Sequence, residues 1–132
     1  MKCILILKEC NLINLNKIMK KIFDAKLRCK IHRKEILNLS QKVQALHIGG
    51  SFSSVEIVDC IYNIFLKKSD KFILSKGHAG IIQYVLLYYL KIINKKELNS
   101  YCQKNGYLGV HPDFGKKGIH ASTGSLGHGL GM

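Results

Sequence analysis

Glycine and proline divide this chain into two parts. All twelve glycines, and the single proline, Pro112, lie beyond Ile48. Both residues disfavour the interior of a regular helix, and glycine is common where a backbone must turn sharply or approach a ligand closely. The segment 17–46, which has neither residue, can therefore form a long helix, whereas glycines interrupt the chain after it. We expect the functional residues in those loops.

Apolar residues recur at helical spacing through most of the chain. Ser53 with Glu56 and Asn94 with Glu97 have the spacing of N-terminal capping boxes. The segment 79–93 is apolar almost all round, as in a buried helix, whereas 71–74 resembles a short buried strand. The pattern predicts helices at residues 17–46, 54–67, 79–93 and 95–105.

Composition limits the classes of partner. The 132 residues carry a net charge of +13, but lysine dominates and only Arg28 and Arg33 are arginine. Readout of base edges favours arginine, so no nucleic-acid partner is expected, and the charge follows the lysine-rich composition of the whole chain. The most apolar stretch, 81–93, is far shorter than the about 20 residues that a membrane span needs. We therefore expect no membrane partner.

Cysteine and histidine spacings argue against a metal site within the chain. The five cysteines are odd in number and include no C-x-x-C pair, so reduced thiols in a cytoplasmic protein are the simplest interpretation. The histidines show neither helical metal-ligand spacing nor a supporting carboxylate cluster. We assign no metal ligand.

Four glycine-flanked segments, each with a histidine, carry the chemistry. Imidazoles beside flexible backbone suit a site that binds phosphate or exchanges protons with sugar hydroxyls. The last segment resembles a dinucleotide fingerprint, but it follows coil rather than a strand and no acidic residue follows it. The segments are L-H-I-G-G-S (46–51), S-K-G-H-A (75–79), G-V-H-P-D (109–113) and A-S-T-G-S-L-G-H-G (121–129).

Taken in this order and spacing, the segments resemble the N-terminal half of transketolase, especially the form divided over two polypeptides. The resemblance covers about residues 19–132 and is strongest at 72–79 and 121–129. It implies an α/β fold: the helix-rich N-terminal part of a three-layer, parallel-sheet domain that binds thiamin diphosphate. Residues 1–18 would be an N-terminal extension, with a strand, a disordered lead or sequence before a start at Met19 as alternatives.

The resemblance also implies roles for individual residues. His78 resembles the histidine beside the cofactor's diphosphate, and Gly124 and Leu126 resemble the loop whose backbone contacts the cofactor near its aminopyrimidine. His47 and His111 resemble catalytic histidines of the substrate channel, which bind sugar hydroxyls and move protons. The cofactor itself supplies the carbanion chemistry.

The chain departs from the family pattern at several positions. The usual G-H-P turn is Leu46-His47-Ile48 here, His120 stands where many relatives have glutamate, and His128 replaces a common glutamine. We therefore give His120 no catalytic role. The family's G-D-G…N motif, which holds Mg²⁺ or Ca²⁺ on the diphosphate, does not occur, so metal ligands are expected beyond residue 132. The activating glutamate, which comes from another domain, is also absent.

These features predict part of a transketolase subunit that is inactive alone. Its partners would be sugar phosphates and a C-terminal transketolase subunit or domain, in a homodimer or heterotetramer. A non-catalytic truncated product that binds a partner, and a fragment similar to 1-deoxy-xylulose-5-phosphate synthase, remain alternatives. Because most of the sheet would lie elsewhere, we expect helix faces to be uncovered, that of 81–93 most of all.

Overall fold

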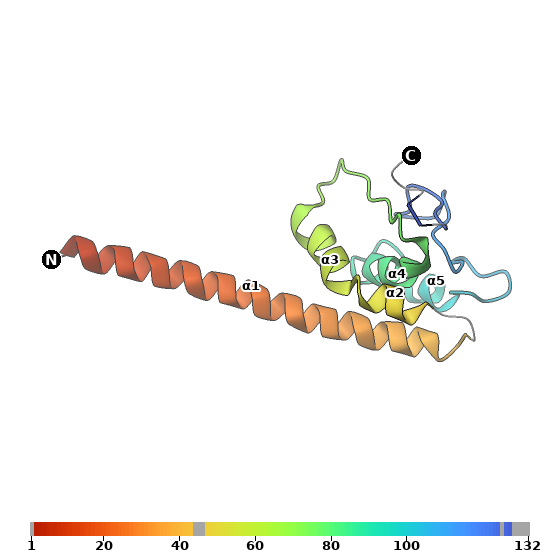
Figure 1. Ribbon diagram of the computed structural model, residues 1–132, viewed down its shortest axis with the longest axis horizontal. Helices are drawn as coiled ribbons and strands as arrows, with labels where there is room; N and C mark the ends of the chain where they lie inside the picture. The colour runs from red at the N-terminus through yellow and green to blue at the C-terminus, as the bar shows by residue number, and fades with distance from the viewer. Residues whose placement is uncertain (1, 44–46, 125, 128–132) are drawn as a thin grey trace.

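A single long helix, α1 (Lys2–Ser40), runs along one side of the molecule and extends beyond it (Figure 1). The computed structural model describes residues 2–43, 47–124 and 126–127, and describes side chains from Leu15 onward. The helix was predicted at 17–46, so it begins earlier and ends earlier than the spacing indicated. Its C-terminal half packs on the core through Cys29, Ile36 and Leu39, which are buried.

Three short helical segments follow α1: α2 (Ile48–Phe52), α3 (Val55–Cys60) and the π-helical turn η1 (Ile61–Phe65). The predicted helix at 54–67 corresponds to α3 and η1, whereas α2 was predicted as a glycine break. The predicted capping box of Ser53 is wrong. Ser54 precedes α3, and Ser53 Oγ instead donates to the carbonyl of Gly50 at 3.0 Å. Glu56 faces α1 and pairs with Arg33 at 2.7 Å.

The predicted strand at 71–74 is wrong, because these residues are extended coil. A strand needs a neighbour to accept and donate its ladder hydrogen bonds, and the described part of the chain contains no strand. The segment is held by side chains instead. Leu74 is buried, and Phe72 packs edge-on against Tyr62 with ring centroids 4.9 Å apart.

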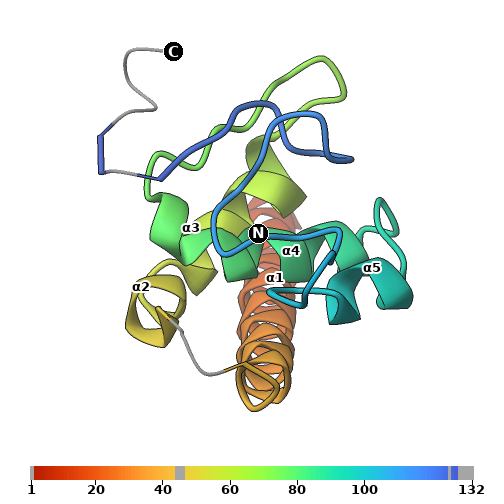
Figure 2. The same cartoon turned by 90° about the vertical axis from the view of Figure 1, so that its right-hand side faces the viewer.

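Helix α4 (Gly80–Tyr89) forms the centre of the fold and follows directly on the 3-10 turn η2 (Gly77–Ala79). It contacts α1, α2, α3 and α5, and every residue from 80 to 87 is buried. Seen along α1, it lies between α2 on one side and α5 on the other (Figure 2). The predicted burial of 79–93 is thus confirmed over this helix, and the expected exposure of its apolar face is wrong. The helix ends at Tyr89 rather than at residue 93, and Lys91, two residues further on, takes a φ of 61°.

Helix α5 (Lys95–Asn99) begins with the predicted capping box. Asn94 Oδ1 accepts from the backbone of Glu97 at 2.8 Å, and Glu97 accepts from the backbone of Asn94 at 2.7 Å. The helix was expected to reach 105, but Cys102 and Asn105 adopt positive φ. The chain then continues as coil to Gly124, anchored by the buried side chains of Leu108 and Ile119.

A buried ion pair joins α1 to α3. Asp59, which is 1% exposed, accepts from Arg28 at 2.8 and 3.1 Å and from Asn63 at 3.0 Å, and lies 3.1 Å from His32 Nε2. Several partners compensate for the desolvation of this carboxylate, as a buried charge requires. The network therefore specifies how α1 lies on α3.

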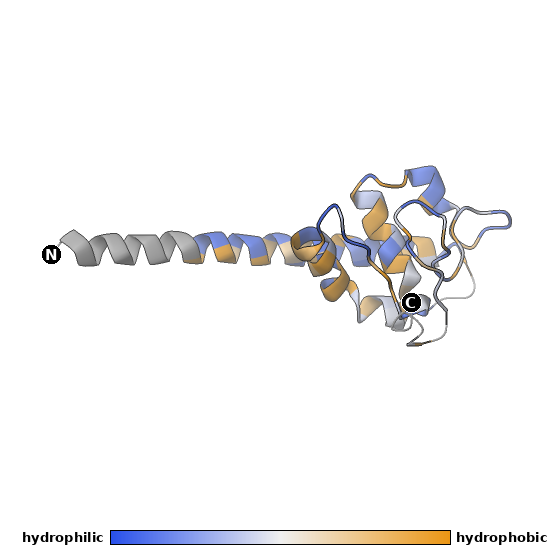
Figure 3. Cartoon of the chain, turned by 90° about the horizontal axis from the view of Figure 1, so that it is seen from above, coloured by the Kyte–Doolittle hydropathy of each residue, from blue (hydrophilic) through white to orange (hydrophobic). Residues whose placement is uncertain are grey.

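The helix-rich part of the predicted fold class is confirmed, and hydrophobic residues concentrate on α3 and α4 (Figure 3). The parallel sheet of that class is not represented in the described residues. Within that same part of the chain, no helix combines the length and apolar character needed to cross a membrane.

Candidate functional site

Three histidines from separate segments meet at one place. His47 precedes α2, His78 lies in η2, and His111 belongs to the coil after α5. The ring of His47 lies 5.6 Å from that of His78 and 6.3 Å from that of His111, centroid to centroid. His47 is exposed and the other two are partly buried, so this histidine cluster is open to solvent. The structure thus brings together three residues that lie far apart in sequence.

Glycine allows the segments to approach so closely. A Cβ at Gly50 would lie 2.6 Å from the ring of His78, and a Cβ at Gly77 would lie 2.7 Å from the backbone of Thr123 and Gly124. Side-chain atoms do not tolerate contacts this short. The glycine-flanked segments predicted to be functional are therefore packed backbone against side chain, or backbone against backbone.

Gly124 lies beside the cluster, whereas the side chain of Leu126 is turned to solvent. His111 Nδ1 is the nearest atom to a Cβ built on Gly124, at 3.9 Å, so Gly124 and His111 lie side by side. The Thr123 amide donates to the Pro112 carbonyl at 3.0 Å and ties this segment to the one that carries His111. Leu126 is 71% exposed. Leu126 and Gly127 form a turn, and the rest of the predicted helix after residue 124, with His128, lies outside the described residues.

Lys76 is a site residue that sequence reasoning missed. Its Nζ donates to the Gly50 carbonyl at 3.1 Å and to Ser53 Oγ at 2.9 Å, and so links η2 to α2. Desolvation lowers the pKa of His78, and the positive charge of Lys76 and the two neighbouring histidines lower it further. His78 is therefore neutral near pH 7 and can accept one hydrogen bond and donate another. The only signal for Lys76 was its place between Ser75 and Gly77.

Five buried side-chain polar atoms have no hydrogen-bond partner among the described residues, and two of them are hydroxyls that adjoin Gly50 and Gly124 in sequence. They are Ser51 Oγ on α2 and Thr123 Oγ1 next to Gly124. Buried polar atoms normally find partners, so these two hydroxyls are unusual among the described residues. The described residues include no group of three His, Cys, Asp or Glu side chains that could hold a metal ion. The donor set fits an anionic, hydroxyl-bearing ligand better than a metal.

The other described histidines lie elsewhere. His120 is exposed, and its Nδ1 lies 3.3 Å from the backbone nitrogen of Phe72 and 3.4 Å from its carbonyl oxygen. His32 belongs to the buried network of Asp59. Neither residue joins the histidine cluster.

Comparison with known proteins identifies the family. The model of the transketolase thiamine diphosphate binding domain matches residues 28–132. The chain therefore belongs to the transketolase thiamine-diphosphate-binding domain family, as the four segments indicated.

Individual relatives agree with this assignment. One of the subunits of the apulose-4-phosphate transketolase of Phocaeicola vulgatus is 30% identical over 115 residues, which cover 80% of this chain and 41% of that protein. Transketolase 2 of Escherichia coli is 33% identical over 101 residues (68% of this chain, 15% of the relative), and the transketolase of Buchnera aphidicola is 34% identical over 104 residues (68% and 15%). The chain thus spans less than half the length of these relatives. No solved structure matches it significantly.

Proposed function

We propose that the chain is the front part of a transketolase subunit that transfers a two-carbon ketol unit between sugar phosphates. The observation that carries this proposal is the convergence of His47, His78 and His111 beside Gly124. Imidazoles and loop backbone groups are suited to a polar channel that binds phosphate and sugar hydroxyls. Membership of the family supports the cofactor, thiamin diphosphate.

Each site residue has a distinct role in this proposal. His78 hydrogen-bonds the diphosphate, and the backbone of Gly124 and Leu126 contacts the cofactor near its aminopyrimidine. The bound cofactor supplies the carbanion chemistry. His47 and His111 bind sugar hydroxyls, and their ring nitrogens accept and return protons near neutral pH. Lys76 keeps the neighbouring charge positive, which favours anionic ligands.

The proposed activity needs residues from elsewhere. We expect the Mg²⁺ or Ca²⁺ ligands and the activating glutamate on another segment or subunit, because a diphosphate without its cation is poorly neutralised. Similarity to one subunit of a divided transketolase supports a partner subunit, and we propose a homodimer or heterotetramer as the working assembly. The free thiols of Cys29, Cys60 and Cys102 are compatible with the cytoplasmic location that we propose.

The test compares cofactor binding and ketol transfer in two proteins. One is the chain as it stands. The other is a chimera, in which the chain is continued by the corresponding segment of the Phocaeicola vulgatus relative and mixed with a C-terminal transketolase subunit. We expect no turnover and weak thiamin diphosphate binding from the first, and both activities from the second.

A matched pair of histidine variants tests the site in the chimera. His78→Ala should weaken cofactor binding, measured by calorimetry, by about tenfold or more, since it removes a hydrogen bond to a charged group. His120→Ala, outside the cluster, should leave binding unchanged. Robust turnover by the 132-residue chain would show that the active site is misplaced. An active chimera indifferent to His78→Ala would exclude the residue assignment but keep the family.

A further inference from the structure

Helix α1 packs on the core through an apolar stripe. Toward the N-terminus this stripe continues into a part of the helix whose large apolar side chains are exposed. Cys29 and Ile36 are buried against the core. Toward the N-terminus the same three- and four-residue spacing leads through Ala25 and Ile22 to Ile18, and both isoleucines are exposed. Residues at this spacing share one helix face. Beside this face, further large apolar side chains are exposed: Leu15, Met19 and Phe23.

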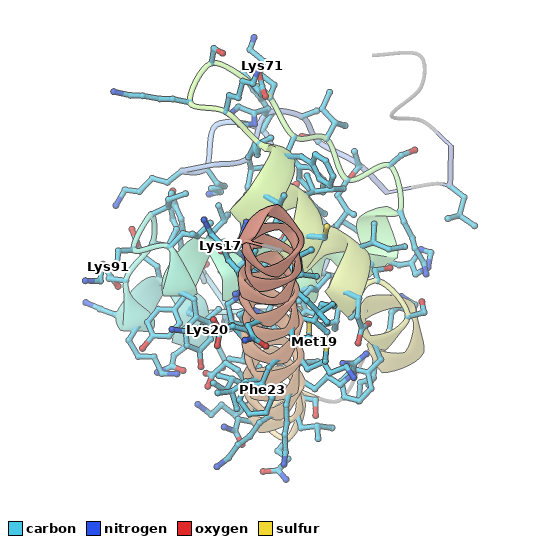
Figure 4. The ribbon with its side chains drawn as sticks, turned by 90° about the vertical axis from the view of Figure 1, so that its left-hand side faces the viewer. Lys17, Met19, Lys20, Phe23, Lys71 and Lys91 are labelled. Carbon is cyan, nitrogen blue, oxygen red and sulfur yellow. The ribbon has the colours of Figure 1, made fainter. Side chains whose placement is uncertain are left out.

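The part of this face from Ile22 to Cys29 forms one wall of a groove. The groove has a volume of about 480 Å³ and runs between α1 and the α3–η1 segment. Ile22, Ala25 and Cys29 line it from α1, and Cys60 and Ile64 line it from the other side. Viewed from the N-terminal end of α1, Met19 projects on one side of the helix, and Lys17 and Lys20 on the other (Figure 4). Because side chains line it from both sides, the groove is a concave apolar surface rather than a single convex helix face.

The rim of the groove is positively charged. Lys26 and Lys30 border it and have no ion-pair partner among the residues that the structure describes. Arg33 and Glu56, also on the rim, neutralise each other at 2.7 Å, and Asp59 is held by Arg28. The unpaired ammonium groups of Lys26 and Lys30 therefore border an apolar groove.

We propose that this groove binds an amphipathic helix of a partner protein, whose apolar face fills the groove and whose acidic flank meets Lys26 and Lys30. An amphipathic helix laid into an apolar groove is a common mode of recognition, and opposite charges at the rim align the partner. A second copy of this chain would bring its own lysines against these, which disfavours self-association. A membrane surface would engage a convex face better than a groove. No groove residue belongs to the histidine cluster, so this proposal is independent of the proposed function.

The test measures binding of designed peptides to the full chain by fluorescence anisotropy. The probe is a fluorescein-labelled 20-residue helical peptide with a leucine stripe and glutamate flanks, and its counterpart carries lysine flanks. We expect saturable binding of the acidic peptide only. Ile22→Asp should weaken it by about tenfold or more, because it charges the centre of the groove. Ile92→Asp is the matched control, since Ile92 is 40% exposed against 44% for Ile22 but lies outside the groove.

A charge exchange keeps the test independent of folding. The double substitution of Lys26→Glu and Lys30→Glu should abolish binding of the acidic peptide and create binding of the basic one. Equal binding of both peptides, or indifference to Ile22→Asp, would overturn the proposal. A dimer in sedimentation that Ile22→Asp dissociates would also overturn it, because the groove would then bind a second copy. Binding of the chain to phosphatidylserine vesicles without binding of the acidic peptide would overturn it as well.

Discussion

Gly77 makes the tightest contact with backbone within the candidate site, and its substitution gives a direct prediction. A Cβ there would lie 2.7 Å from the backbone of Thr123 and Gly124, which cannot move aside like a flexible side chain. Gly77→Ala should lower the free energy of unfolding by about 1–3 kcal/mol, as overpacking does. Urea titration measures the change.

Gly49 is the control for this substitution. It lies in α2, and a Cβ placed there would have nothing within 4 Å. Because alanine favours a helix over glycine, Gly49→Ala should leave stability unchanged or raise it by up to about 1 kcal/mol. If both variants lost the same stability, the close contact of Gly77 would not be the cause.

His32 makes stability depend on pH. Burial lowers its pKa, and Arg28 adds to this, although Asp59 opposes the shift. Below the ordinary histidine pKa of about 6.5, the unfolded chain therefore binds a proton that the folded chain resists. The melting temperature should fall between pH 7 and pH 5.5, and the fall should be smaller in His32→Gln. His120→Gln, at an exposed position, should retain the full fall. A pH dependence that His32→Gln leaves unchanged would contradict this.

For single residues, the sequence predicted which histidines lie close together better than it predicted how they are held. His47, His78 and His111 could be named because glycine flanks each of their segments. Lys76 could not, since its partners, the Gly50 carbonyl and Ser53 Oγ, come from the separately folded α2. The buried partnership of Asp59 with Arg28 was equally invisible, because a sequence shows charges but not which helix faces meet.

Among the helices, α5 depends most directly on its cap. Both hydrogen bonds of the capping box are present, and the helix has only five residues. Asn94→Ala should lower the free energy of unfolding by about 0.5–2 kcal/mol, because an amide of the first turn loses its acceptor. Thermal or urea unfolding measures this. Asn38→Ala, at an exposed position within α1, should cost nothing; an equal loss there would point to asparagine removal in general rather than to the cap.

The differences between predicted and observed helix ends have local causes. Helix α4 ends near Tyr89 and α5 near Asn99 because the following backbone takes positive φ at Lys91 and Cys102, residues that carry no such signal. The predicted strand at 71–74 failed for a different reason. Its apolar run does occupy the core through Leu74, but strand pairing depends on a neighbour that local sequence does not reveal.

For the molecule as a whole, the predicted domain boundary at residue 18 stays a prediction, and it can be tested by deletion. The buried side chains of α1 begin at Cys29. A chain that starts at Met19 should therefore keep its melting temperature within about 2 °C, since few folded-state contacts are lost. A start at Cys29 would remove Arg28, the partner of Asp59, and should lower the melting temperature clearly. Equal losses in both would place the first 18 residues within the folded unit.

The uncovered apolar surface lies where the whole-molecule expectation did not place it. A helix-rich part of a layered domain was expected to expose the segment 81–93, but α4 became the centre on which the other helices pack. Exposed apolar side chains lie instead on α1 and η1, where Phe23 and Phe65 are 67% and 68% exposed. The described residues contain no sheet, so a central helix is the best place for the most apolar segment.

The central position of α4 has a consequence for motion. Its first residue, Gly80, lies against Pro112 of the segment that carries His111; η2, with His78, leads directly into it; and α2, behind His47, packs on it. The segments that carry the three histidines thus all contact α4 or lead directly into it. Amide hydrogens around them should exchange with deuterated water at rates set by the cooperative opening of that helix rather than by independent fluctuations of each loop. The three histidines should therefore stay together for as long as α4 remains folded.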